Sequence, residues 1–295
     1  MILSQLKNLI KKIFLLRNKT DEMPEKISEY KPDASEPWSN GYNEYKWQSI
    51  NESINNSQLL EQFKDGLSPL NFGIGLDERI VEYTWLFSRK ILSNGKFLDA
   101  GSTFNFEELI NHKQLQNSAK YIYTYYPEYN NYGSQRVSYI YGDLRSMPFR
   151  DDFFDTVICQ STLEHIAMDN SMYGYELGTN EVKEKNYEYL AVIEELIRVT
   201  SPGGKILLTF PYGVFENHGF FQQLDEEMAT QILNIMSKKC NVQETYFKYF
   251  PTGWIFSDRQ KCNDAKSFNP HTGVGRGNDN AAHSRAICCL EAIKL

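Results

Sequence analysis

Short apolar runs alternate with amphipathic segments in the middle of the chain. Apolar residues run through 97–100, 121–125, 137–141, 156–159 and 206–210, and patterns with helical spacing occur at 106–112 and 187–199. This alternation is typical of an α/β fold, in which a parallel sheet is covered by helices on both faces. The sequence therefore predicts a mostly parallel sheet within residues 96–210.

The flanking segments extend this core at both ends. Residues 45–94 carry helical patterns, most clearly at 78–92, and we expect them to form a helical layer over the sheet. After the core, a helix is expected at 224–237 and strands at 242–250 and 285–293, with one antiparallel strand near the C-terminus. Residues 251–284, rich in Gly, Asn and Asp, are interpreted as an insertion between those strands.

The N-terminal segment combines an apolar stripe with a basic opposite face. Residues 1–17 are therefore predicted to form an amphipathic basic helix. Residues 18–45 are polar and contain three prolines, so they are interpreted as a linker, which leaves residues 46–295 as the main domain. The helix has three interpretations: docking on its own domain, peripheral contact with an anionic membrane, or binding to a partner protein.

Charge and cysteine content narrow the class of protein. Five basic and no acidic residues lie in the first 20, and the whole chain carries −7, so the remainder carries −12. Nucleic-acid binding is not expected, because phosphate neutralisation needs a basic face. The five cysteines show no CxxC spacing, so neither a disulfide framework nor a metal site is predicted and a cytoplasmic location is expected. No apolar run reaches the length of a membrane span.

Polar residues and glycine follow three of the predicted strands. Asp99 and Gly101 follow the first strand, Asp143 follows the third, and Ser161 and Thr162 follow the fourth. Glycine lets a ligand approach the backbone, and a following helix start offers unpaired N–H groups. Because open α/β sheets bind ligands at the carboxyl ends of their strands, the sequence predicts a ligand site at this edge.

Three strings in order resemble class I S-adenosylmethionine-dependent methyltransferases, specifically the group described as methyltransferase type 11. The strings are FLDAGSTFN at 97–105, YGDLRSMPFRDDFFDTVICQSTLEHI at 141–166 and EELIRVTSPGGKILLTFP at 194–211. A closer resemblance, covering 120 residues or so, is to bacterial methyltransferases associated with surface-glycan biosynthesis. The resemblance implies a Rossmann-like sheet of about seven strands with a helical N-terminal extension.

The resemblance further implies S-adenosylmethionine as cofactor. The residues implied to bind it are Asp99, Gly101 and Ser102 at its amino-acid end, Asp143 and Leu144 beside adenine, and Ser161 and Thr162 near its methionine portion. The chain departs from the family pattern twice. Only one glycine stands in the first loop, so Asn105 is expected to supply a left-handed turn. Glu128 is the candidate to hold the ribose, with a tyrosine or a backbone group as the alternative.

Glu164 and His165, just beyond the fourth strand, have two interpretations. Both residues could order the loop, or His165 could act as general base for a substrate hydroxyl, with Glu164, Asp169 and Tyr173 close enough in sequence to share that work. The stretch 168–187, rich in Tyr and Gly, is interpreted as a substrate loop.

The resemblance implies methyl transfer to a small-molecule or glycan acceptor, with a hydroxyl of a glycan or glycan precursor as the expected target. A nicotinamide dehydrogenase shares the α/β plan but needs a GxGxxG first loop, which the chain lacks. A non-catalytic cofactor-binding or scaffold protein of a glycan-assembly complex remains the alternative.

Overall fold

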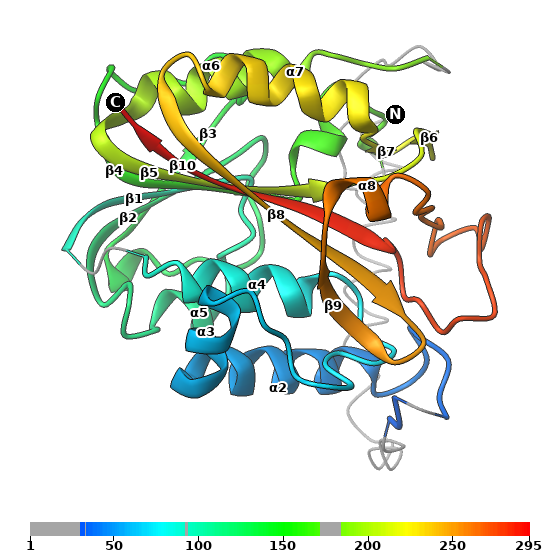
Figure 1. The fold of residues 1–295 in the computed structure, drawn as a ribbon. Helices are drawn as coiled ribbons and strands as arrows, with labels where there is room; N and C mark the ends of the chain where they lie inside the picture. Colours follow the sequence, from blue (N-terminus) through cyan, green and yellow to red (C-terminus); the bar gives the residue numbers. More distant parts are fainter. Residues whose placement is uncertain (1–29, 33, 92–93, 172–183) are drawn as a thin grey trace, which may run out of the picture.

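One sheet of eight strands forms the centre of the protein, and helices cover both of its faces (Figure 1). The computed structural model describes residues 30–32, 34–91, 94–171 and 184–295. The expected N-terminal helix at 1–17, the beginning of the expected linker and Tyr173 lie outside these residues.

Five parallel strands form one half of the sheet and an antiparallel group forms the other. The spatial order is β3-β2-β1-β4-β5-β10-β8-β9. Strand β10 is antiparallel to both of its neighbours, β5 and β8. The strands are β1 (Asn94–Ala100), β2 (Asn117–Thr124), β3 (Val137–Tyr141), β4 (Phe154–Gln160), β5 (Thr200–Pro211), β8 (Cys240–Phe250), β9 (Gly253–Ser257) and β10 (Ala286–Lys294).

This arrangement confirms the predicted mostly parallel, Rossmann-like sheet with one antiparallel strand near the C-terminus. Strand β9 is an addition, because it lies inside the expected insertion at 251–284 and pairs with β8 through a tight turn. Gly253 has φ 98°, and a Cβ there would lie 2.4 Å from the carbonyl oxygen of Phe72, so this turn requires glycine.

Helices form a layer on each face of the sheet (Figure 1). Helices α6 (Tyr189–Val199) and α7 (Glu226–Met236) cover one face, and α2 (Tyr42–Asn55), α3 (Ser57–Lys64) and α4 (Arg79–Ser88) cover the other. The two interfaces form two separate apolar cores. No helix within the described ranges is long and apolar enough to cross a bilayer. Short elements are α5 (Glu107–Ile110), α8 (Arg259–Cys262), the 3₁₀ turns η1 (Gly133–Gln135) and η2 (Leu163–His165), and the ribbon of β6 (Glu216–Asn217) and β7 (Gln222–Gln223).

The segment before the expected domain boundary at residue 46 packs on the domain from residue 30 onward. Tyr30 and Tyr42 are buried, and α2 already begins at Tyr42. The Tyr42 hydroxyl donates a hydrogen bond to Asp77 at 3.0 Å, and the Trp38 indole N–H donates to the Ala282 carbonyl at 2.7 Å. The second contact ties this segment to the insertion near the C-terminus.

Candidate cofactor-binding and active site

A cavity of about 300 Å³ lies at the carboxyl ends of β1, β2 and β4. Loops from neighbouring parallel strands converge here, as expected for an open α/β sheet. Among the residues predicted from the sequence, seven line the cavity: Gly101, Glu128, Asp143, Leu144, Ser161, Thr162 and His165. Four others do not line it: Asp99, Ser102, Glu164 and Asp169.

Asp99 lies beneath the first loop and holds its backbone. Its buried carboxylate accepts hydrogen bonds from the backbone N–H of Phe104 at 2.8 Å and of Thr103 at 3.2 Å. Burial raises the pKa of Asp99 to about 7, and the hydrogen bonds from the loop oppose this rise. Asp99 therefore shapes the loop that borders the cavity and does not line the cavity itself.

The first loop turns through Gly101 and Ser102. Gly101 has φ 128°, and a Cβ there would lie 2.1 Å from Thr162 Oγ1, so a larger residue would be strained and would clash with the Thr162 side chain. Ser102 has φ 64°, whereas Asn105 is not among the residues with positive φ. The expectation that Asn105 supplies the left-handed turn was therefore wrong, because the chain reverses immediately after Gly101.

Asn105 instead connects the first loop to the loop after β2. Its side-chain amide donates to Glu128 at 2.9 Å and to the Asn130 carbonyl at 3.2 Å, while its oxygen accepts from the Tyr139 hydroxyl at 2.8 Å. These bonds orient the exposed Glu128 carboxylate at the cavity. The signal available in the sequence for this role was a polar amide between two aromatic residues, Phe104 and Phe106.

The loop after β3 presents a carboxylate, an apolar side chain and a guanidinium. Arg145 binds Asp143 through Nε at 3.1 Å and Nη2 at 2.7 Å, which holds the pKa of the Asp143 carboxyl below its usual range. The Leu144 side chain is buried and also lines the cavity. Arg145 was not predicted from the sequence, and Asp143 already has a cationic partner before any ligand binds.

A buried glutamate of α4, also missed by the sequence analysis, binds the ends of β4 and β5. Glu82 accepts hydrogen bonds from the Ser161 hydroxyl at 2.5 Å and the Thr209 hydroxyl at 2.6 Å. Its second oxygen accepts a hydrogen bond from the Gln160 amide at 3.1 Å and forms an ion pair with the Arg79 guanidinium at 2.7 Å. Ser161 therefore directs its hydroxyl toward α4, and the helical layer fixes the strand ends at the cavity. The signal available in the sequence was Glu82 as the one charged residue in the stretch 80–87.

The three candidates for proton transfer lie in different environments. The ring of His165 lines the cavity, and its Nδ1 lies 2.8 Å from the Phe220 carbonyl oxygen. Burial lowers the pKa of His165 to about 4 and raises the pKa of Glu164 to about 8, so both are neutral at pH 7. Glu164 is buried behind η2, and its Oε2 has no hydrogen-bond partner within the described structure.

Asp169 is exposed and forms a local turn. Its carboxylate accepts a hydrogen bond from the backbone N–H of Ser171 at 3.0 Å, which lowers the pKa of Asp169. The neighbouring Asn170 lines the cavity in its place. Over the described ranges, the structure contains no group of three or more His, Cys, Asp or Glu residues arranged to hold a metal ion.

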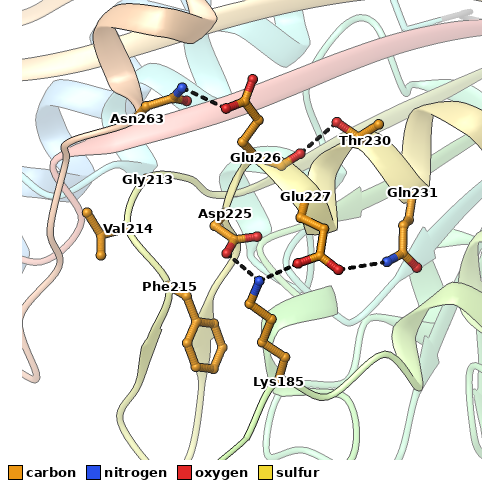
Figure 2. A pocket seen from close by; sticks show the side chains of 10 residues that line it. All are labelled: Lys185, Gly213, Val214, Phe215, Asp225, Glu226, Glu227, Thr230, Gln231 and Asn263. Carbon is orange, nitrogen blue, oxygen red and sulfur yellow. Dashed lines mark hydrogen bonds and ion pairs between the residues drawn. The ribbon is translucent and has the colours of Figure 1, made fainter.

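A larger hollow of about 830 Å³ lies beside α7. The Lys185 ammonium forms ion pairs with Asp225 at 2.7 Å and with Glu227 at 2.6 Å (Figure 2), so the charge of Lys185 is already paired. Glu226 accepts a hydrogen bond from the Asn263 amide at 3.0 Å (Figure 2). None of the predicted site residues lines this hollow, so the cavity at the strand ends is the better candidate site.

The chain is similar in sequence to one protein family and in fold to several solved structures. Residues 111–208, about a third of the chain, match the family model described as a methyltransferase domain. This segment runs from just before β2 into β5 and includes the loop after β3 and the end of β4. Over this segment the match supports the enzyme class predicted from the sequence, a methyltransferase.

No curated protein matches the chain in sequence. Solved structures to which it is similar include the YcgJ protein from Bacillus subtilis, with 13% identity and a TM-score of 0.41, covering 70% of this chain and 94% of that chain. Another is the 1,6-didemethyltoxoflavin-N1-methyltransferase of Burkholderia thailandensis, with 11% identity and a TM-score of 0.41, covering 68% of this chain and 71% of that chain. A third is the N-methyltransferase NodS of Bradyrhizobium japonicum, with 10% identity and a TM-score of 0.41, covering 74% of this chain and 97% of that chain.

Proposed function

We propose that the protein transfers a methyl group from S-adenosylmethionine to a hydroxyl of a glycan or glycan precursor. The observation that carries the oxygen acceptor is the position of His165, which lines the cavity just beyond the end of β4. The bound sulfonium supplies an electrophilic methyl group and a neutral thioether as leaving group. The protein's main task is then to align the acceptor with that methyl group.

The hydrogen bond of His165 fixes which nitrogen can accept a proton. A carbonyl oxygen only accepts hydrogen bonds, so the Nδ1 that faces Phe220 carries the ring proton. Nε2 then holds the lone pair, and the low pKa keeps the ring neutral at pH 7. As the new O–CH₃ bond forms and the S–CH₃ bond breaks, Nε2 accepts the proton that leaves the hydroxyl.

The residues at the cavity suit the cofactor's adenosine portion. The apolar Leu144 side chain can pack on the adenine ring, and Glu128 offers a carboxylate that can accept hydrogen bonds from ribose hydroxyls. Asn105 already orients this carboxylate at 2.9 Å. Because Asp143 is bound to Arg145, we assign it a lesser part in adenine binding than Leu144.

A sugar acceptor is supported by the residues around the cavity and by the sequence resemblance. Tyr125 lines the cavity, and it and Tyr126 are exposed in the loop after β2. Tyrosine presents an apolar ring face and a polar tip, which suits the alternating surface of a sugar. The five cysteines are buried and unbridged, in keeping with a cytoplasmic reaction, and residues 1–17 would bring the enzyme to an anionic membrane surface.

The test is transfer of isotopically labelled methyl groups from S-adenosylmethionine to glycan precursors extracted from the source organism. We expect labelled O-methyl sugars that survive alkaline hydrolysis, which cleaves methyl esters but not ethers. His165→Asn should keep cofactor affinity and melting temperature while the rate falls about a hundredfold or more, since general-base assistance contributes about 10² to 10⁴.

His271→Asn, at an exposed histidine of the insertion, is the matched control and should retain the wild-type rate. A variant His165→Asn that keeps its rate within a few-fold would make His165 an ordering residue. Cofactor binding without transfer to any precursor fraction would favour the alternative, a non-catalytic cofactor-binding or scaffold protein.

A further inference from the structure

Segment 165–170 runs from the end of η2 along the cavity and carries His165. Ile166, Ala167 and Asn170 of this segment line the cavity as well. Ala167 has φ 56°, a positive value that is unfavourable for alanine. A backbone in such a conformation persists only where the surrounding structure holds it. The contacts that hold segment 165–170 therefore determine where the imidazole of His165 lies.

The turn between β6 and β7, residues 218–221, holds this segment from one side. The Phe220 carbonyl oxygen lies 2.8 Å from His165 Nδ1. The Gly219 carbonyl accepts a hydrogen bond from the Asp169 backbone N–H at 3.1 Å. These two contacts attach both ends of the segment to the turn, so the position of His165 depends on the position of the turn.

Asn186, just before α6, binds both the segment and the strand that follows the turn. Its side-chain amide donates a hydrogen bond to the Ile166 carbonyl at 2.5 Å, and its side-chain oxygen accepts one from the Glu188 N–H at 2.8 Å. Its backbone forms a reciprocal pair with Gln222 of β7. The Asn186 N–H donates to Gln222 Oε1 at 3.1 Å, and Gln222 Nε2 donates to the Asn186 carbonyl at 2.8 Å. Both residues are buried, so water does not compete for these bonds.

We propose that Asn186 and Gln222 are positioning residues, which hold His165 so that Nδ1 faces the turn and Nε2 is presented to the acceptor. Asn186 acts through the carbonyl of Ile166, the next residue after His165. Gln222 acts through the turn that carries the Phe220 carbonyl. Neither residue lines the cavity. This inference rests on the proposed role of His165 as general base and adds the residues that would keep the base in place.

The pKa of His165 reports whether its ring is held in this position. Burial lowers that pKa to about 4, and a ring that moves toward solvent should regain a value nearer the ordinary 6.5 or so. His218 of the turn stacks on Phe221, whose ring also contacts His165. The other charged and titratable groups that face His165 are Glu78 and Arg79 of α4 and His283 of the insertion.

The first test is nuclear magnetic resonance of the full-length chain carrying ¹⁵N-labelled histidine, with His165→Asn to identify the His165 signals. In the wild type we expect a proton on Nδ1 and a pKa near 4. Asn186→Ser keeps an oxygen that can accept from the Glu188 N–H but lacks the amide that binds Ile166. It should raise the pKa of His165 to about 5.5 or above.

Gln222→Met, which removes the reciprocal pair at similar volume, should raise the pKa of His165 in the same way and serves as the second variant. Asn55→Ser, at an exposed asparagine of α2 that bonds Asn51, is the matched control and should leave the pKa unchanged. An unchanged pKa in both Asn186→Ser and Gln222→Met would overturn the positioning role. This test needs no acceptor, so it decides that role even if the glycan proposal fails.

The second test is a double-mutant cycle on labelled methyl transfer to the extracted precursors. Asn186→Ser should lower the rate about 10- to 100-fold, because a small displacement of a reacting group has effects of this size, and S-adenosylhomocysteine affinity should stay close to wild type. In the His165→Asn background it should cause no further loss. Losses that multiply would overturn the positioning role alone, whereas a wild-type ring with its proton on Nε2 would overturn the assignment of the base as well.

Discussion

Replacement of Glu82 by glutamine tests whether the helical layer holds the strand ends at the site. The Glu82 carboxylate is fully buried and receives four donors, from Arg79, Gln160, Ser161 and Thr209. Glutamine keeps one acceptor oxygen and replaces the other with an amide that only donates. The substitution therefore places a donor against donors and removes the charge that balances Arg79.

The magnitude follows from the burial of this ion pair. Removing one partner of a buried pair costs about 3–5 kcal/mol. The Arg79 side chain retains 27% of its exposure, so we expect the lower end, about 3 kcal/mol. For a domain of this size, each kcal/mol shifts the melting temperature by about 2–4 °C, so Glu82→Gln should melt roughly 6–12 °C lower.

Urea denaturation of the wild-type and variant chains measures this loss directly. Glu61→Gln is the matched control, because Glu61 forms an exposed pair with Lys64 at 3.2 Å, and its loss should not exceed about 0.5 kcal/mol. A loss below about 1 kcal/mol for Glu82→Gln would refute the reasoning, because the four donors would then not depend on the carboxylate.

Three further predictions concern the loop, η2 and the N-terminus. Gly101→Ala should weaken S-adenosylhomocysteine binding about 10-fold or more in calorimetry, because its Cβ would lie 2.1 Å from Thr162 Oγ1; unchanged affinity contradicts this. Burial raises the pKa of Glu164 from 4.5 to about 8, because the folded protein favours the neutral carboxyl. The stability that the neutral carboxyl contributes is fully present below about pH 4.5 and is lost as the pH rises to about 8. Glu164→Gln should therefore gain stability over wild type, by a few kcal/mol, between pH 5 and pH 8 in urea titrations; a pH-independent difference opposes this. Deleting residues 1–17 should abolish flotation with anionic vesicles, and equal flotation of both chains would indicate docking on the domain.

The parallel core was predictable because its signals are local. Apolar runs bounded by turns mark β1 to β5, and these strands lie where the runs occur. The predicted helix at 106–112 is regular only over Glu107–Ile110, since His112 turns its ring to the Gln114 N–H and the Ile54 carbonyl. That deviation depends on a contact with α2 that sequence spacing does not contain.

The candidate site was predictable only where its residues end a strand. Gly101, Asp143 and His165 follow strands, so the sheet edge brings them together. Glu82 binds Gln160 and Thr209, which are 78 and 127 residues away in sequence, and no local pattern reveals such pairings.

A crystal structure of the full chain with S-adenosylhomocysteine tests the central claim most directly. Density for the ligand should occupy the cavity at the ends of β1, β2 and β4, with adenine against Leu144, ribose hydroxyls at Glu128 and the carboxylate at Ser102. Density elsewhere, or an empty cavity in crystals grown with saturating ligand, would contradict the assignment of this edge as the cofactor site.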